Sequence, residues 1–126
     1  MFGLYNRRIY NVEFTEENKE MFNDLLTEIY KILRDSTYTA QANWIKEILF
    51  TVQKEDPNLF KQKVISAELL GGAGSVVDVW IEEEEEMKKL DSLLTDFLEL
   101  TFKSGLKHRA LKARMTRKII TNPNNV

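Results

Sequence analysis

The sequence contains no cysteine and a single histidine, His108, so it lacks the side chains that most often bind transition metals. The absence of cysteine also excludes disulfide bonds, and such a composition suits a protein of the reducing cytoplasm. We therefore expect neither a metal site nor a cofactor, and we expect the protein to be cytoplasmic.

Long hydrophobic runs are missing as well. No stretch approaches the roughly 20 apolar residues that a transmembrane helix requires. Near the N-terminus, Arg7 and Arg8 are followed by the polar residues Asn11 and Glu13, whereas a signal peptide continues with about 7–15 apolar residues. The sequence therefore predicts a protein that does not contact a membrane.

The composition that is present is ordinary for a folded protein. Of the 126 residues, 43% are hydrophobic and 30% are charged. This length fits one domain with one hydrophobic core. We expect residues 1–126 to form a single domain, in which 1–13 are an N-terminal arm, 14–120 are the helical core and 121–126 are a flexible tail.

Apolar residues recur with the period of an α-helix over most of the chain. In the first such stretch they fall at i, i+3, i+4, i+7 and i+11, namely Phe22, Leu25, Leu26, Ile29 and Leu33. Thr15 is a suitable N-cap for this helix, and Asp56-Pro57 is typical of another helix start. Trp44 is expected to be a core anchor or a packing edge rather than a ligand platform. The pattern predicts a mainly α single-domain bundle of about five helices, over residues 15–33, 37–53, 57–69, 82–103 and 106–119.

One run departs from the helical period. Residues 76–81, Val-Val-Asp-Val-Trp-Ile, are rich in β-branched side chains. They could form a short strand pair with residues near 4–12, or a buried extended segment. The bundle is therefore expected to contain at most this small β element.

A glycine-rich turn interrupts the chain, and its structural residues are expected to be Gly71, Gly72, Gly74, Ser75 and Asp78. Gly71 or Gly72 can end the preceding helix in the left-handed conformation. Glycine-rich turns that bind phosphate follow a strand and open a helix, whereas this turn follows a helix. No Lys-Ser or Lys-Thr pair comes directly after it, so the P-loop pattern fails. We expect a tight structural turn, with an unknown enzyme or ligand site there as the alternative.

Ser75 and Asp78 are the residues that a catalytic site at this turn would use. A nucleophilic serine needs a nearby base, and His108 lies between Lys107 and Arg109 in a basic stretch. We therefore expect Ser75 to cap a turn and Asp78 to accept backbone hydrogen bonds. No catalytic residue is expected, and the protein is not expected to be an enzyme.

Charge is segregated along the chain. Five consecutive glutamates open the fourth predicted helix, whereas residues 103–118 contain seven Lys and Arg and no acidic residue. An acidic surface steers a basic partner, so the candidate partner-binding residues are Glu82, Glu83, Glu84, Glu85 and Glu86. The alternative is a nucleic-acid-associated protein that uses Lys107, Arg109, Lys112 and Arg114 of the basic C-terminal helix. No aromatic residue is interleaved with these cations to stack on bases, so nucleic acid is the weaker alternative.

The element Gly71-Gly72-Ala73-Gly74-Ser75-Val76-Val77-Asp78, with Trp44-Ile45 in an earlier helix, resembles a set of small bacterial helical proteins of uncharacterised function. The resemblance covers residues 15–102. The sequence departs from that set at Ala73, where a bulkier apolar residue is usual, at Val77, where a polar residue is common, and in its basic C-terminal helix. The resemblance implies a helical domain and no particular activity.

These observations favour a non-catalytic protein-binding module. Small helical proteins with an acidic face are common among bacterial toxin-immunity proteins, and this analogy rests on size and charge alone. The leading hypothesis is therefore an immunity protein that neutralises a bacterial toxin by binding it.

Overall fold

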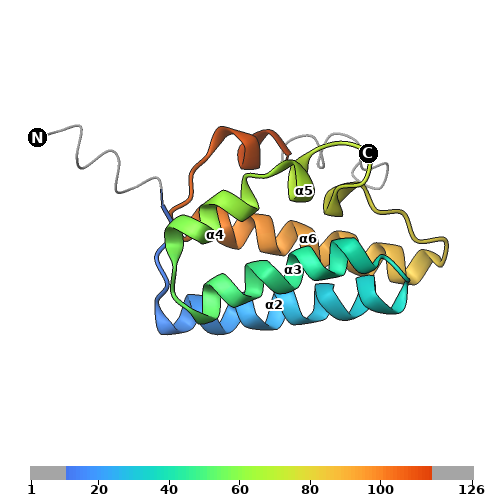
Figure 1. The fold of residues 1–126 in the computed structure, drawn as a ribbon, viewed down its shortest axis with the longest axis horizontal. Coiled ribbons are helices and arrows are strands. Elements are labelled where there is room, and N and C mark those ends of the chain that lie inside the picture. The colour runs from blue at the N-terminus through green and yellow to red at the C-terminus, as the bar shows by residue number, and fades with distance from the viewer. Residues whose placement is uncertain (1–10, 115–126) are drawn as a thin grey trace, which may run out of the picture.

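The computed structural model describes residues 11–114, and its regular structure is helical (Figure 1). The mainly α fold class that the periodicity predicts is confirmed, and no strand is present between residues 11 and 114. In chain order, the main elements are α2 (Glu16–Asp35), α3 (Thr39–Gln53), α4 (Pro57–Val64), α5 (Ala67–Leu70), the 3-10 turn η1 (Val76–Asp78) and α6 (Glu84–Lys103). A further helical stretch follows α6 and covers 109–114.

The predicted start signals act as expected at two helices. The Thr15 hydroxyl accepts a hydrogen bond from the Asn18 N–H at 3.1 Å and caps α2. The Asp56 carboxylate accepts from the Leu59 N–H at 3.1 Å and caps α4, whose first residue is Pro57. Each cap satisfies a backbone donor that the helix itself leaves unpaired.

Helix α2 packs against both α3 and α6 (Figure 1). Helices α4 and α5 pack in turn on α3. The apolar residues predicted to line one face of α2 are buried, except for Leu25, which stays partly exposed beside α6. Four residues of α2 have no exposed surface, namely Phe22, Leu26, Ile29 and Leu33.

Four phenylalanine rings join the elements at one end of the bundle. The Phe60 ring of α4 lies 5.2 Å from Phe22 of α2, 6.3 Å from Phe97 of α6 and 5.3 Å from Phe14, measured between centroids. All these pairs meet edge to face, which is the geometry that aromatic quadrupoles favour. The cluster therefore links three helices and the segment that precedes α2.

The segment before α2 is held against the turn that follows α6. The Glu13 N–H donates to the Ser104 carbonyl at 2.9 Å. Gly105 has a φ of 123°, and a Cβ atom there would lie 2.4 Å from the Asn11 carbonyl oxygen. Only glycine fits this crossing without moving the backbone. The arm predicted over 1–13 is thus packed at residues 11–13, and residues 1–10 lie outside the described part, as does the tail 121–126.

The single helix predicted over 57–69 is wrong, because the chain breaks between α4 and α5. The Ser66 hydroxyl donates to the Lys63 carbonyl and accepts from the Leu69 N–H, so it caps a new helix. The Trp44 indole N–H also donates to the Lys63 carbonyl, at 3.2 Å. Trp44 is half-buried against the core, as an anchoring residue should be, and it satisfies a carbonyl that the break frees.

The short strand considered for 76–81 does not form. Residues Val76–Asp78 make one 3-10 turn, and 79–81 have no regular secondary structure. Side chains take the place of a strand partner: the Tyr38 hydroxyl donates to the Trp80 carbonyl, and the Ile81 N–H donates to the Met87 sulfur at 3.2 Å. The proposed partner strand, near 4–12, falls mostly outside the described residues.

Lys19 ties α2 to the loop between α3 and α4. Its ammonium lies 2.8 Å from the Glu16 carboxylate and 3.4 Å from the Glu55 carboxylate. The hydrogen bond to Glu16, together with that to Glu55, raises the pKa of Lys19 above its usual 10.5, although desolvation acts in the opposite direction. While both carboxylates are ionised, this stabilisation is therefore present below pH 10.5 and is lost as the pH rises through the folded-state pKa of Lys19.

Replacement of Phe60 by alanine tests the role of the aromatic cluster. We expect Phe60→Ala to lower the free energy of unfolding by about 3–5 kcal/mol, because a fully buried ring leaves a cavity. Phe50 on α3 is 53% exposed and is the matched control, for which Phe50→Ala should change stability by less than about 0.5 kcal/mol. Urea unfolding followed by circular dichroism measures both, and equal effects would contradict the assignment.

Candidate functional site

The glycine-rich turn has structural contacts at each end. At its start, Gly71 ends α5, and a Cβ atom there would lie 2.8 Å from the Ala67 carbonyl oxygen. At its end, the Gly74 carbonyl accepts a hydrogen bond from the Gln41 side chain of α3 at 2.9 Å. The left-handed residue is Gly74, with a φ of 88°, and the expectation that Gly71 or Gly72 adopts this conformation is wrong. Gly71 instead caps α5 in an extended conformation.

Ser75 and Asp78 do not assemble a reactive site. Ser75 is buried, and its hydroxyl oxygen has no hydrogen-bond partner among the described residues. It occupies the N-cap position of η1 without making the cap hydrogen bond, so the capping role predicted for it is wrong. The Asp78 carboxylate is exposed and forms no hydrogen bond with the described backbone. A serine without a base beside its hydroxyl is not activated as a nucleophile.

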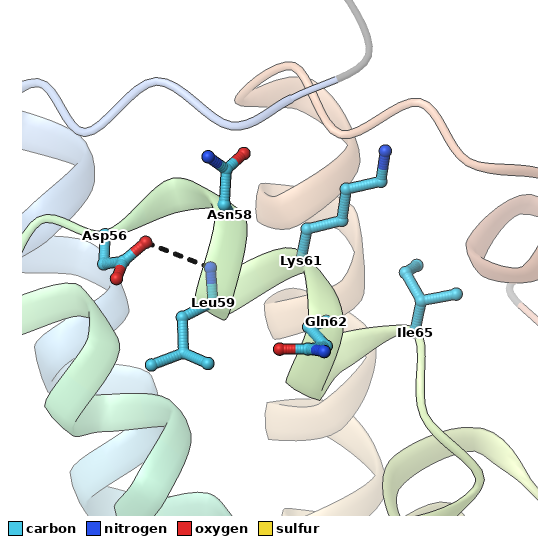
Figure 2. Close-up of a pocket in the computed structure, with 6 residues that line it drawn as sticks. All are labelled: Asp56, Asn58, Leu59, Lys61, Gln62 and Ile65. Carbon is cyan, nitrogen blue, oxygen red and sulfur yellow. Dashed lines mark hydrogen bonds between the residues drawn. The ribbon is translucent and has the colours of Figure 1, made fainter.

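A broad hollow of about 760 Å³ lies along α4 (Figure 2). Figure 2 shows its lining side chains standing apart rather than converging on one point. Asp56 is occupied in capping the helix, and the Asn58 side chain accepts a hydrogen bond from the Asn11 amide at 3.0 Å. The hollow therefore brings no acid and base together around a shared substrate position.

The five candidate glutamates are all exposed, and they surround the start of α6. The helix begins at Glu84 rather than Glu82, because the Glu83 carboxylate accepts hydrogen bonds from the Glu85 and Glu86 N–H groups and caps it. Glu84 pairs with Lys88 one turn later at 3.3 Å, whereas Glu82 precedes the cap. The run is therefore an exposed acidic patch on an ordered helix start, where the dipole favours negative charge.

Trp80 is a surface residue that the sequence interpretation missed. Val79 and Ile81 are buried and Trp80 between them is 69% exposed, the most exposed of the large hydrophobic side chains described. The period-two alternation of an extended segment could have placed it outward, since neighbouring side chains point to opposite faces. Trp80 lies two residues before the Glu82–Glu86 run, so an exposed indole and five carboxylates share one region of the chain.

The four candidate basic residues near the C-terminus differ in their surroundings, although the sequence presents them as one basic stretch. Lys107 donates to the Phe102 carbonyl at 3.3 Å and lies 4.6 Å from the centre of the Phe102 ring. Arg114 is half-buried and donates to the Val77 carbonyl at 3.3 Å. Arg109 and Lys112 are exposed on the helical stretch 109–114. Two of the four candidate residues are thus engaged with the protein's own backbone.

His108 acts at the start of that last helical stretch. Its Nδ1 accepts a hydrogen bond from the Ala110 N–H at 3.1 Å, and its carbonyl accepts from the Lys112 N–H. The helix predicted from Leu106 therefore begins later, and its part beyond residue 114 lies outside the described residues. A histidine in this capping position uses the ring nitrogen that a general base would need free.

Among residues 11–114, no group of three or more metal-ligating side chains is clustered closely enough to bind a metal ion. None of the helices described combines the length and the apolar character needed to cross a bilayer.

No family model matches the chain, and no curated protein or solved structure is significantly similar to it. The resemblance of the Gly71–Asp78 element to small bacterial helical proteins therefore stays a prediction.

The two glycines at the start of the turn provide a test of its structural role. Gly71→Ala should destabilise the fold by about 1–3 kcal/mol, because the new methyl group meets the Ala67 backbone. Gly72→Ala should be neutral or stabilising by up to about 1 kcal/mol, since open space surrounds that position and its φ is not left-handed. Thermal unfolding of both variants measures the difference, and a larger loss for Gly72→Ala would refute this account of the turn.

Proposed function

We propose that this chain is a non-catalytic protein-binding module that recognises a basic partner. The observation that carries the proposal is the exposed indole of Trp80, which precedes the exposed acidic run Glu82–Glu86 by two residues. Tryptophan is strongly enriched among the residues that dominate binding energy at protein interfaces. The combination supplies an apolar anchor together with charges that select the partner.

The Trp80 segment is ordered before any partner binds. Val79 and Ile81 on either side are buried, and the Tyr38 hydroxyl and the Met87 sulfur hold the Trp80 carbonyl and the Ile81 N–H. A loop whose backbone is already positioned loses less conformational entropy on association. The exposed indole can therefore contribute to affinity with little reorganisation of the loop.

The glutamates would act mainly on the rate and specificity of association. Negative charge steers a basic partner toward the surface, and this effect weakens as ionic strength rises. A nucleic acid is repelled by the same charges, since its backbone is also negative. The acidic surface therefore favours a basic protein over a nucleic acid as the partner.

At the finer level we propose that the module is an immunity protein that neutralises a bacterial toxin in the cytoplasm. Enzymes that cleave nucleic acids carry basic clefts, which an acidic protein of this size can occupy. The small helical domain and its acidic surface support this assignment by analogy. The cysteine-free composition is compatible with a reducing compartment.

Affinity capture with the full chain as bait tests the binding proposal. We expect one basic protein to be retained from extracts of the source cells and to bind the purified bait directly. Trp80→Ala should weaken that binding at least about tenfold, because truncation of an interface tryptophan removes its buried area. The triple variant Glu84→Gln, Glu85→Gln, Glu86→Gln should slow association and reduce its salt dependence. Calorimetry and stopped-flow kinetics measure these effects.

Phe50→Ala is the control, because Phe50 is also an exposed aromatic residue and lies on α3. The proposal is wrong if no direct partner is found, or if Trp80→Ala binds as tightly as Phe50→Ala. The immunity assignment has its own readout: the captured partner expressed alone should arrest bacterial growth, and co-expression of the wild-type chain should restore it. A harmless partner would end the immunity assignment and leave the binding proposal standing.

A further inference from the structure

A second surface feature lies between α2 and α6, away from Trp80. It is a groove of about 390 Å³ whose apolar part consists of Met21, Leu25 and Leu100. Met21 is 44% exposed, and the two leucines are half-buried. These three side chains give the groove an apolar floor that is open to solvent.

The groove is flanked by acidic side chains from both helices. Asp24 comes from α2, and Asp96 and Glu99 come from α6. None of these three carboxylates forms an ion pair with another residue in 11–114. Lys103 contributes one positive charge at the C-terminal end of α6. The groove thus has an apolar floor and a net negative rim.

We propose that this groove binds an amphipathic basic helix of a partner protein. A groove between two helices accepts the apolar face of a third helix, which presents anchors at i, i+3 or i+4, and i+7. Residues Asp96–Lys103 span about 10 Å along α6, which matches about two turns of such a helix. Lys and Arg on the flanks of the incoming helix would pair with the three carboxylates.

A second copy of this chain fits the groove less well. If the groove lay on the two-fold axis of a symmetric dimer, the patch would face itself, and the carboxylates of one protomer would lie opposite those of its partner. Addition of a strand needs an exposed sheet edge, and residues 11–114 contain no strand. Charge complementarity therefore favours a basic helix from another protein.

The groove is independent of the Trp80 surface proposed above. Glu84 and Asp96 are twelve positions apart on α6, which corresponds to about 18 Å along the helix axis. Either surface can therefore bind a partner when the other does not, and variants can separate them.

A labelled model peptide tests the groove. The probe is an amphipathic helix of about 18 residues, built from leucine, alanine and lysine with the leucines at helical spacing. We expect it to bind the full chain with a Kd in the micromolar range, measured by fluorescence anisotropy. A peptide with the same composition in scrambled order should bind at least about fivefold more weakly, and one with glutamate in place of lysine should not bind.

Two matched pairs of substitutions locate the site. Asp24→Asn with Asp96→Asn removes two charges from the groove and should weaken peptide binding about tenfold. Glu84→Gln with Glu86→Gln removes two charges from the other acidic surface and should leave binding within about twofold. Met21→Glu should abolish binding, and Trp80→Ala should preserve it. All four carboxylates and Met21 are exposed, so the variants should remain folded, which circular dichroism checks.

Three results would overturn the proposal. Equal weakening by the two charge-neutralised pairs would mean that the peptide binds through general electrostatic attraction. Loss of peptide binding in Trp80→Ala would place the peptide on the other surface. A wild-type dimer in sedimentation analysis that Met21→Glu converts to a monomer would show that a second copy covers the groove.

Discussion

The edge-to-face contacts of Phe60 with Phe14, Phe22 and Phe97 hold α4 against α2, α6 and the segment before α2. They join elements that are distant in sequence, and the burial of such rings supplies a large share of the stability of a small core. Helix α4 has only eight residues, too few to be stable alone, so its position depends on Phe60. With α4 fixed, the chain that follows is directed back over α3.

That returning chain, from Lys63 to Trp80, is held by three side chains from the start of α3. Tyr38, Gln41 and Trp44 are spaced three residues apart and so lie along one face of the helix. They donate hydrogen bonds to the carbonyls of Trp80, Gly74 and Lys63, respectively. Regular secondary structure is sparse in this segment, so side-chain donors satisfy backbone groups that a strand or helix would otherwise pair. The exposed position of Trp80 depends on these three side chains of α3.

The parts of the fold that the sequence predicts correctly are those governed by local interactions. The period of α2, its Thr15 cap and the Asp56-Pro57 start each involve residues within one or two turns. The break before α5 involves Trp44 in addition to the local Ser66 cap, and the segment 76–81 is held by Tyr38. Trp44 and Tyr38 are both distant in sequence from the segments that they contact. The acidic run was evident from the sequence, but the exposure of Trp80 and the groove at Leu25 and Leu100 follow from how α2 and α6 pack. Tertiary contacts override local pattern at these positions.

The contrast between the two tryptophans gives the protein a pair of internal optical probes. Trp44 is half-buried with its indole N–H bonded to a carbonyl, whereas Trp80 is largely in water. Indole emission shifts to longer wavelength as the ring becomes hydrated, so the two residues emit differently in the same folded chain. Loss of the core would move the Trp44 emission toward the red, and burial of Trp80 would move its emission toward the blue. Unfolding and partner binding at Trp80 therefore shift the tryptophan emission in opposite directions.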